Sequence, residues 1–353
     1  MRIALIMSHA DRNMAGATRE LHFMRTLREQ GAEVAVFRIH AGAVIEQEAY
    51  QDGAVTVTFV PEDAPGEAVP HRKTSTALVG ALRGFAPDVV IFKGLSYSIN
   101  AFVAAAMGSE LRYGFIVGGA VRDPVLDGAR FVFGEYEEQL STHFAEFAAQ
   151  GRGFLLPKYI DLEATRPPQP PLPAEYDIAN VGNFYEKRKN QRDLLPFAAE
   201  FRLLLAGGGK PDPAVFGAAM KTGHLHFPGR LDHSALFPLL HRSRIMVHTS
   251  TMDGLPRAMV EAMACGLPVV AYRDTVRGGL QHGVQGFLVA PDELDATVRR
   301  LLGDEALCRQ MGQAARAHVE ATHGVPAIQQ AARRFLDFLR SDPLPSNPMR
   351  SDR

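Results

Sequence analysis

Two carboxylates, Asp253 and Glu261, lie eight positions apart in the second half of the chain. The residues around them predict a short helix, because Pro256 suits a first helical turn and Gly266 suits the left-handed residue that ends a helix. The apolar run after Gly266 predicts a buried strand. Asp253 would then lie in the loop before the helix and Glu261 within the helix. A polyhydroxylated ligand linked to a nucleotide needs two carboxylates in such an arrangement.

The start of this predicted helix is suited to an anion. The backbone N–H groups of Gly254, Leu255 and Arg257 have no partner within the helix, and Pro256 has no N–H group. They also carry the positive end of the helix dipole. This position therefore predicts a site for phosphate or for a developing negative charge.

Glu261 allows two interpretations. It could simply pair with Arg257, four residues earlier on the same helix. Small side chains flank it, however, so the carboxylate is expected to be crowded and partly buried, and buried carboxylates are rare without a partner. These flanking residues are Ala258, Ala262, Ala264 and Cys265.

Composition limits the class of protein. The chain has 353 residues, of which 46% are hydrophobic, enough for the cores of two domains. A net charge of −1 gives no electrostatic basis for binding nucleic acid. Cys265 and Cys308 lie far apart in predicted helices, which argues against a disulfide framework. Residues 2–7 predict a first strand rather than a signal peptide, and no apolar run has the length of a membrane span. We expect a cytoplasmic chain, with peripheral contact to the inner face of a membrane left open.

Apolar runs alternate with helical patterns in both halves of the chain, which predicts the α/β class with parallel sheets flanked by helices. The predicted strands of the first half are 3–7, 33–39, 88–92 and 111–117, with a helix at 19–30. Those of the second half are 178–181, 201–206, 225–227, 245–248 and 269–272, with a helix at 234–242. Ligands of such sheets collect at the carboxyl ends of the strands.

Five prolines between positions 166 and 173 predict an extended connector between the halves. We therefore predict one domain at 1–172 and a second at 173–340. The chain reads as helical from 305 onward, with an apolar stripe through Ile328, Ala331 and Phe335. Residues 341–353 hold three prolines and no apolar stripe, which predicts a disordered tail.

The stretch 253–271 resembles the signature of retaining glycosyltransferase family 4, in which an E-x7-E motif precedes a helix and a strand of the pattern G-x-P-V-V-A. Asp253 stands at the first acidic position and Glu261 at the second. The resemblance implies a GT-B fold, in which two Rossmann-like parallel-sheet domains face a cleft. The first domain would bind the acceptor and the second the nucleotide-sugar, and the last helix often returns to the first domain. Asp253 would hold hydroxyls of the donor sugar, and Glu261 those of the ribose.

The loop from Gly182 resembles the part of the family that neutralises the nucleotide diphosphate. Family members place an arginine shortly after this glycine, where Asn183 stands here, and a lysine often followed by asparagine, which Lys189 matches. Lys187 and Arg188 could share the charge compensation. A solvated basic turn is the alternative.

Other loops extend the resemblance. Gly16 stands where family members carry two adjacent glycines that contact the donor phosphate, although a plain turn between strand and helix is the alternative. The glycine turn 206–210 resembles another family turn and also fits a flexible loop. Arg230, in a turn similar to the family's F-x-G turn, could stack on the nucleotide base, contact phosphate or lie at the surface. The segment 274–289 resembles the closing pattern of the family.

One family feature is missing from the first half. Several members hold the donor sugar with a histidine in a loop that corresponds here to 118–123, and this loop contains none. Arg122, Asp123 or a residue of another loop could replace it, and His9 is one such residue.

No D-x-D motif occurs, so we expect a mechanism without a metal or another cofactor, in which basic side chains and helix N-termini stabilise the leaving diphosphate. Lys189 and Asp253 are the predicted catalytic residues. Retention in this family is thought to proceed by front-face attack, with the donor phosphate accepting the proton of the acceptor. No enzyme nucleophile is then required.

We therefore expect a glycosyltransferase that moves a hexose from a nucleotide-sugar donor to a hydroxyl acceptor with retention. A GT-B epimerase or phosphorylase and a non-catalytic binder of sugar nucleotides are the alternatives. An NAD oxidoreductase is disfavoured because the G-x-G-x-x-G fingerprint is missing. Loops at 41–54 and 61–73 are expected to bind the acceptor. The donor base and sugar, the identity of the acceptor and the oligomeric state are left open by the sequence.

Overall fold

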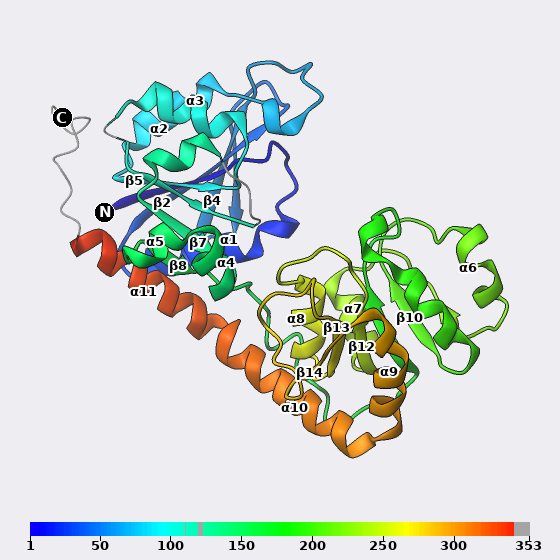
Figure 1. Ribbon diagram of the computed structural model, residues 1–353. Helices are drawn as coiled ribbons and strands as arrows, with labels where there is room; N and C mark the ends of the chain where they lie inside the picture. Colours follow the sequence, from blue (N-terminus) through cyan, green and yellow to red (C-terminus); the bar gives the residue numbers. More distant parts are fainter. Residues whose placement is uncertain (110, 119–122, 342–353) are drawn as a thin grey trace. The chain divides into compact units, whose positions relative to one another are not determined.

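The computed structural model describes residues 1–109, 111–118 and 123–341, with only the backbone of Ala15. The chain divides into two compact units (Figure 1). Unit 1 comprises Met1–Tyr159 and Val325–Arg353, and unit 2 comprises Ile160–Gly324. Of the predicted disordered tail, 341–353, only Ser341 lies within the described residues, as the last residue of a helix.

Unit 1 is built on a sheet with the strand order β3-β4-β2-β1-β5-β6-β7-β8. All neighbouring strands are parallel except β3 and β4, which are antiparallel. The strands are β1 (Arg2–Met7), β2 (Glu33–His40), β3 (Glu46–Tyr50), β4 (Val55–Pro61), β5 (Val89–Lys93), β6 (Tyr113–Ile116), β7 (Phe131–Gly134) and β8 (Gly153–Leu155). The helices are α1 (Thr18–Glu29), α2 (Thr76–Phe85), α3 (Ser98–Met107), α4 (Glu137–His143), α5 (Ala145–Ala149) and α11 (Val325–Ser341). Short 3-10 helices are η1 (Ala15–Ala17), η2 (Pro70–Arg72) and η3 (Pro124–Gly128).

Two apolar cores cover the faces of this sheet. One packs α1 and α11 against the strands, and the other packs α2, α3 and α4 against the opposite face. A central strand between two such layers must be apolar along its whole length, and Ile3, Ala4, Leu5 and Ile6 of β1 are all fully buried.

The C-terminal helix α11 belongs to unit 1 although it follows unit 2 in sequence. The predicted stripe of Ile328, Ala331 and Phe335 is confirmed, since all three are buried. The ring of Phe335 lies with its centroid 4.7 Å from that of Phe131 and 4.8 Å from that of Phe133. This aromatic cluster attaches α11 to β7.

Unit 2 is built on a parallel sheet with the order β11-β10-β9-β12-β13-β14. The strands are β9 (Tyr176–Val181), β10 (Leu203–Ala206), β11 (Leu225–His226), β12 (Ser243–His248), β13 (Val269–Tyr272) and β14 (Gly286–Val289). The helices are α6 (Pro213–Met220), α7 (His233–Leu240), α8 (Arg257–Ala264), α9 (Leu294–Gly303) and α10 (Glu305–Thr322). Short 3-10 helices are η4 (Lys187–Lys189), η5 (Gln191–Ala199) and η6 (Pro291–Glu293). The predicted α/β class with two parallel sheets is confirmed.

The division between the units precedes the proline-rich segment at which the sequence placed the boundary. Arg316 of α10 donates hydrogen bonds to the carbonyl oxygens of Leu162 and Thr165, at 2.8 and 3.1 Å, and of Ala264, at 2.6 Å. These bonds attach the chain to unit 2 before its prolines begin.

Strand β3 lies inside the segment 41–54, which the sequence analysis predicts only as a loop. It pairs with β4 at an edge of the sheet, where Gln47 and Ala49 are exposed. An edge strand with polar residues on both faces carries no apolar alternation, so its sequence gives no strand signal. Among the described residues of both units, no helix has the length and apolar character needed to span a membrane.

Candidate functional site

The candidate site of unit 2 lies where the order of its strands reverses. Strand β9 has β10 on one side and β12 on the other, so the loops that follow β9 and β12 leave the same edge of the sheet in divergent directions. A crevice at this topological switch point is the usual ligand position in an open parallel sheet. The loop after β9 carries Lys189, and the loop after β12 carries Asp253.

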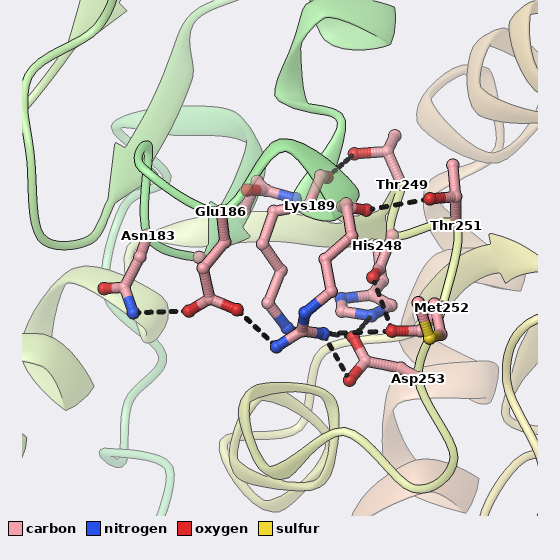
Figure 2. Close-up of polar contacts among 12 residues, drawn as sticks. Asn183, Glu186, Lys189, His248, Thr249, Thr251, Met252 and Asp253 are labelled. Carbon is pink, nitrogen blue, oxygen red and sulfur yellow. Dashed lines mark hydrogen bonds and ion pairs between the residues drawn. The ribbon is translucent and has the colours of Figure 1, made fainter. Parts of the chain in front are cut away.

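Hydrogen bonds to backbone carbonyl oxygens tie these two loops together. Thr249 donates its hydroxyl to the carbonyl oxygen of Lys189 at 3.0 Å, and the N–H of Thr251 bonds the carbonyl oxygen of Arg188 at 2.8 Å. The guanidinium of Arg188 reaches the carbonyl oxygen of Met252 at 2.9 Å. These bonds hold Arg188 and Lys189 against the loop that carries Asp253 without the help of a ligand (Figure 2).

Asp253 accepts hydrogen bonds from three basic side chains. Lys189 Nζ lies 2.8 Å and His248 Nε2 3.1 Å from Oδ2, while Arg188 Nη1 lies 3.0 Å from Oδ1. Burial alone raises the pKa of Asp253, but the hydrogen bonds from His248 and Lys189 outweigh it and hold this pKa well below its ordinary value. Figure 2 shows Lys189 and His248 converging on Asp253. The two predicted catalytic residues, Asp253 and Lys189, thus form one ion pair.

His248 is a member of this site that the sequence analysis missed. It is the last residue of β12, and its side chain is 1% exposed. Burial lowers the pKa of His248 despite the hydrogen bond to Asp253, so the ring is neutral near pH 7 and donates through Nε2. Nδ1 is buried without a hydrogen-bond partner in the described chain. A histidine at the carboxyl end of a predicted strand was the available signal.

Glu261 is both paired with Arg257 and buried, as the two interpretations of the sequence expect. It is 4% exposed, and its Oε1 accepts from Arg257 Nη1 at 3.2 Å and lies 3.1 Å from His233 Nε2. The hydrogen bond to Glu261 raises the pKa of His233, whose ring stacks on Phe237. Oε2 makes no hydrogen bond to the residues that the structure describes. His233 was also missed, because it lies 28 positions before Glu261 in the sequence.

The residues that begin α8 differ slightly from expectation. The helix begins at Arg257, and Pro256 is its N-cap rather than part of its first turn, because the backbone of Pro256 is still extended. No side chain caps this N-terminus. Gly254 accepts a hydrogen bond from the N–H of Arg277 at 2.7 Å, and Leu255 is buried. Gly266 has the expected left-handed backbone, with φ of 83°.

The loop from Gly182 is compact. A Cβ atom at Gly182 would lie 3.3 Å from the side chain of Lys189, so glycine leaves room for that lysine. Asn183 accepts from the N–H of Gly208 at 2.9 Å and donates to Glu186 at 2.7 Å. Asn183, which stands where family members carry arginine, therefore holds the loop in shape.

The remaining predicted residues of unit 2 lie apart from this network. Lys187 is exposed, unlike its neighbours Arg188 and Lys189. Arg230 is exposed after β11, in a loop whose Gly229 carbonyl accepts from the N–H of Gly207 at 2.9 Å. Of the three clustered basic residues, Arg188 and Lys189 are the two that bond Asp253.

Gly207, in the turn that the sequence analysis describes as fitting a flexible loop, is held close to a neighbouring loop. A Cβ atom there would lie 2.0 Å from the carbonyl oxygen of Gly182. The glycine turn after β10 therefore allows the two loops to approach.

Two of the predicted residues of unit 1 line one pocket of that unit. Gly16 lies in η1 and lines the pocket together with His9. Asp123 accepts from the N–H groups of Ser96 and Val125, at 2.5 and 3.0 Å, and so caps η3. Arg122, the other candidate to replace the missing histidine, lies outside the described residues.

The chain is similar to known proteins in sequence and in fold. Residues 175–304 match the family model described as glycosyl transferases group 1. The N-acetyl-alpha-D-glucosaminyl L-malate synthase of Bacillus anthracis is 29% identical over 183 residues, covering 48% of this chain and 47% of that protein. The match thus spans about half the length of this curated relative.

Solved structures extend the likeness to the whole fold. Sucrose-phosphate synthase from Thermosynechococcus elongatus has a TM-score of 0.75 at 18% identity, over 97% of this chain and 100% of that one. The Anabaena protein HepE, solved in complex with UDP, has a TM-score of 0.69 at 16% identity over the same shares. This chain therefore has the GT-B fold, and its residues 175–304 match the family model of glycosyl transferases group 1.

Proposed function

We propose that the protein transfers a hexose from a nucleotide-sugar donor to a hydroxyl acceptor with retention of configuration at the anomeric carbon. The observation that carries the proposal is the ion pair of Lys189 and Asp253 at the switch point of the unit 2 sheet, with a distance of 2.8 Å between Nζ and Oδ2. The matched glycosyltransferase domain contains both residues.

The two carboxylates have separate roles in this proposal. Oε2 of Glu261, which makes no hydrogen bond to described residues, accepts from the ribose hydroxyls. Asp253 accepts three hydrogen bonds in the structure. In the proposal, Asp253 also accepts from a hydroxyl of the donor sugar. The two acidic groups would bind opposite ends of the same donor.

Lys189 and Arg188 would stabilise the leaving diphosphate. Their side chains are held by Asp253 and by the backbone before the donor binds, so little reorganisation is needed as negative charge develops. No side chain caps the N-terminus of α8, and its N–H groups add partial positive charge to that of Lys189 and Arg188. We propose on this basis that transfer needs no divalent cation.

A UDP-sugar is the first donor to test, because the structurally similar HepE was solved with UDP. The protein is incubated with UDP-glucose, UDP-N-acetylglucosamine and their GDP and ADP counterparts, in the presence and absence of EDTA, with a panel of hydroxyl acceptors. Proton NMR of the product reports the anomeric configuration. Transfer with retention that survives EDTA supports the proposal, whereas inversion or dependence on a divalent cation contradicts the corresponding part of it.

A further inference from the structure

His248 is a polar residue at the end of an otherwise apolar strand segment. It closes β12, which has β9 on one side and β13 on the other. Ile245, Met246 and Val247 before it are fully buried, and the side chain of His248 is itself 1% exposed. Burying an imidazole costs free energy unless its N–H group is hydrogen-bonded. The contacts of the ring therefore have to account for its place in the strand.

The ring makes one hydrogen bond to the residues that the structure describes. Nε2 lies 3.1 Å from Oδ2 of Asp253, and Nδ1 is buried without a partner in the same part of the chain. A proton on Nδ1 would have no acceptor there, and Nε2 would then face a carboxylate oxygen, lone pair against lone pair. The neutral ring therefore carries its proton on Nε2 and donates it to Asp253.

Among the side chains that bond Asp253, His248 is the one that belongs to a strand. Lys189 and Arg188 are long side chains from the short η4 turn after β9. Ser250, whose hydrogen bond also lowers the pKa of Asp253, lies on the same loop between β12 and α8 as Asp253 itself. His248 thus connects this carboxylate to the core of the sheet.

His248 also differs from the basic partners of Asp253 in charge. Under the proposed function, Lys189 and Arg188 contact the leaving diphosphate, whose oxygens then compete with Asp253 for their N–H groups. Burial lowers the pKa of His248, so its ring is neutral near pH 7 and is not drawn to the diphosphate. Its hydrogen bond to Oδ2 can therefore persist while the two cations turn towards the donor.

We infer that His248 is a positioning residue, which holds the carboxylate of Asp253 in place for the donor sugar while Lys189 and Arg188 neutralise the diphosphate. It acts through Asp253 and contacts no part of the donor. This inference rests on the proposed function, because it needs a donor sugar at Asp253. The imidazole should then affect recognition of the sugar and not of the nucleotide.

Calorimetry and transfer assays with the donor panel described above test this difference. Each nucleotide-sugar and its free nucleoside diphosphate are compared in the native protein and in His248→Leu, which lacks the N–H group. The variant should lose about 10-fold or more in affinity for the nucleotide-sugar and in kcat/KM, because a hydrogen bond to a charged group is removed. Its affinity for the free nucleoside diphosphate should change little.

Two conservative variants test whether the N–H group itself is needed. Glutamine at position 248 can place an amide N–H near the position of Nε2, whereas asparagine is one methylene shorter and cannot reach it. His248→Gln should therefore restore most of the lost affinity for the nucleotide-sugar, and His248→Asn should not. Should His248→Leu fail to fold, these two variants make the same comparison.

His241→Leu is the matched control, because it makes the same change at a half-buried histidine of unit 2. Nε2 of His241 lies 3.2 Å from the carbonyl oxygen of Thr165, outside the network of Asp253. This variant should lose stability and keep its donor binding and its kcat/KM.

A double-mutant cycle with Asp253→Ala tests whether His248 acts through Asp253. In the Asp253→Ala protein, His248→Leu should cause little further loss of affinity for the nucleotide-sugar, so the two losses are not additive in free energy. Additive losses overturn the inference while the donor site stands. So does a ratio of nucleotide-sugar to nucleotide affinity that His248→Leu leaves unchanged. If the native protein binds no nucleotide-sugar, the proposed function fails and this inference fails with it.

Discussion

Lys189 and Asp253, 64 positions apart in the sequence, form an ion pair with 2.8 Å between Nζ and Oδ2. Parallel strands β9 and β12 place the loops that carry them at one edge of the sheet, and hydrogen bonds from Thr249 and Thr251 to the backbone of the basic loop keep them together. The proposed donor site depends on this pairing of two loops.

Replacing Lys189 by alanine should weaken UDP binding by about 10- to 100-fold, because a charge-assisted contact to the diphosphate is lost. Uridine, which has no phosphate, should lose little affinity. Calorimetry with both ligands measures the difference. Lys187→Ala is the matched control, as the neighbouring Lys187 is exposed. If uridine and UDP lost equal affinity, Lys189 would not contact the diphosphate and would belong to the surface of the loop.

Gly207→Ala should destabilise unit 2 by about 1 to 3 kcal/mol, the usual cost of overpacking, because its Cβ would lie 2.0 Å from the carbonyl oxygen of Gly182. Urea unfolding measures the change. Gly217→Ala in α6 is the control, since a Cβ there has no neighbour within 4 Å and alanine favours a helix by about 1 kcal/mol. An unchanged free energy of unfolding for Gly207→Ala would show that the loops do not need this close approach.

The ion pair of His233 and Glu261 should make stability depend on pH. The hydrogen bond to Glu261 raises the pKa of His233 above its ordinary value of about 6.5. A pKa that folding raises gives a stabilisation that is complete below about pH 6.5 and is lost as the pH rises through the raised pKa.

The native protein and His233→Gln are compared by thermal unfolding between pH 6 and 9. The difference in Tm should be largest at the acid end and shrink with increasing pH. The comparison with the variant removes the opposite contributions of His241, His248 and His318, whose pKa values burial lowers. A difference that stays constant with pH would mean that His233 is not charged beside Glu261.

The sequence predicts the strands and the acidic motif better than the contacts of the site. Strand β13, Val269–Tyr272, has the predicted bounds because apolar runs buried on both faces give a strong local signal. His233 and His248 were missed because their contacts are fixed by the fold. His233 and Glu261 lie 28 positions apart in the sequence, and the predicted strand end at His248 does not show that its ring reaches Asp253. The exposure of Lys187 between paired neighbours likewise depends on the turn of η4.

Binding of UDP, GDP and ADP to the native protein and to Glu261→Ala tests the central claim most directly. Calorimetry should show that one nucleotide binds the native protein and that the variant loses at least about 10-fold in affinity, because a buried carboxylate that bonds ribose hydroxyls is removed. Glu305→Ala, which removes an exposed carboxylate from α10, should bind as the native protein does. Undiminished binding by a folded Glu261→Ala protein would contradict the account.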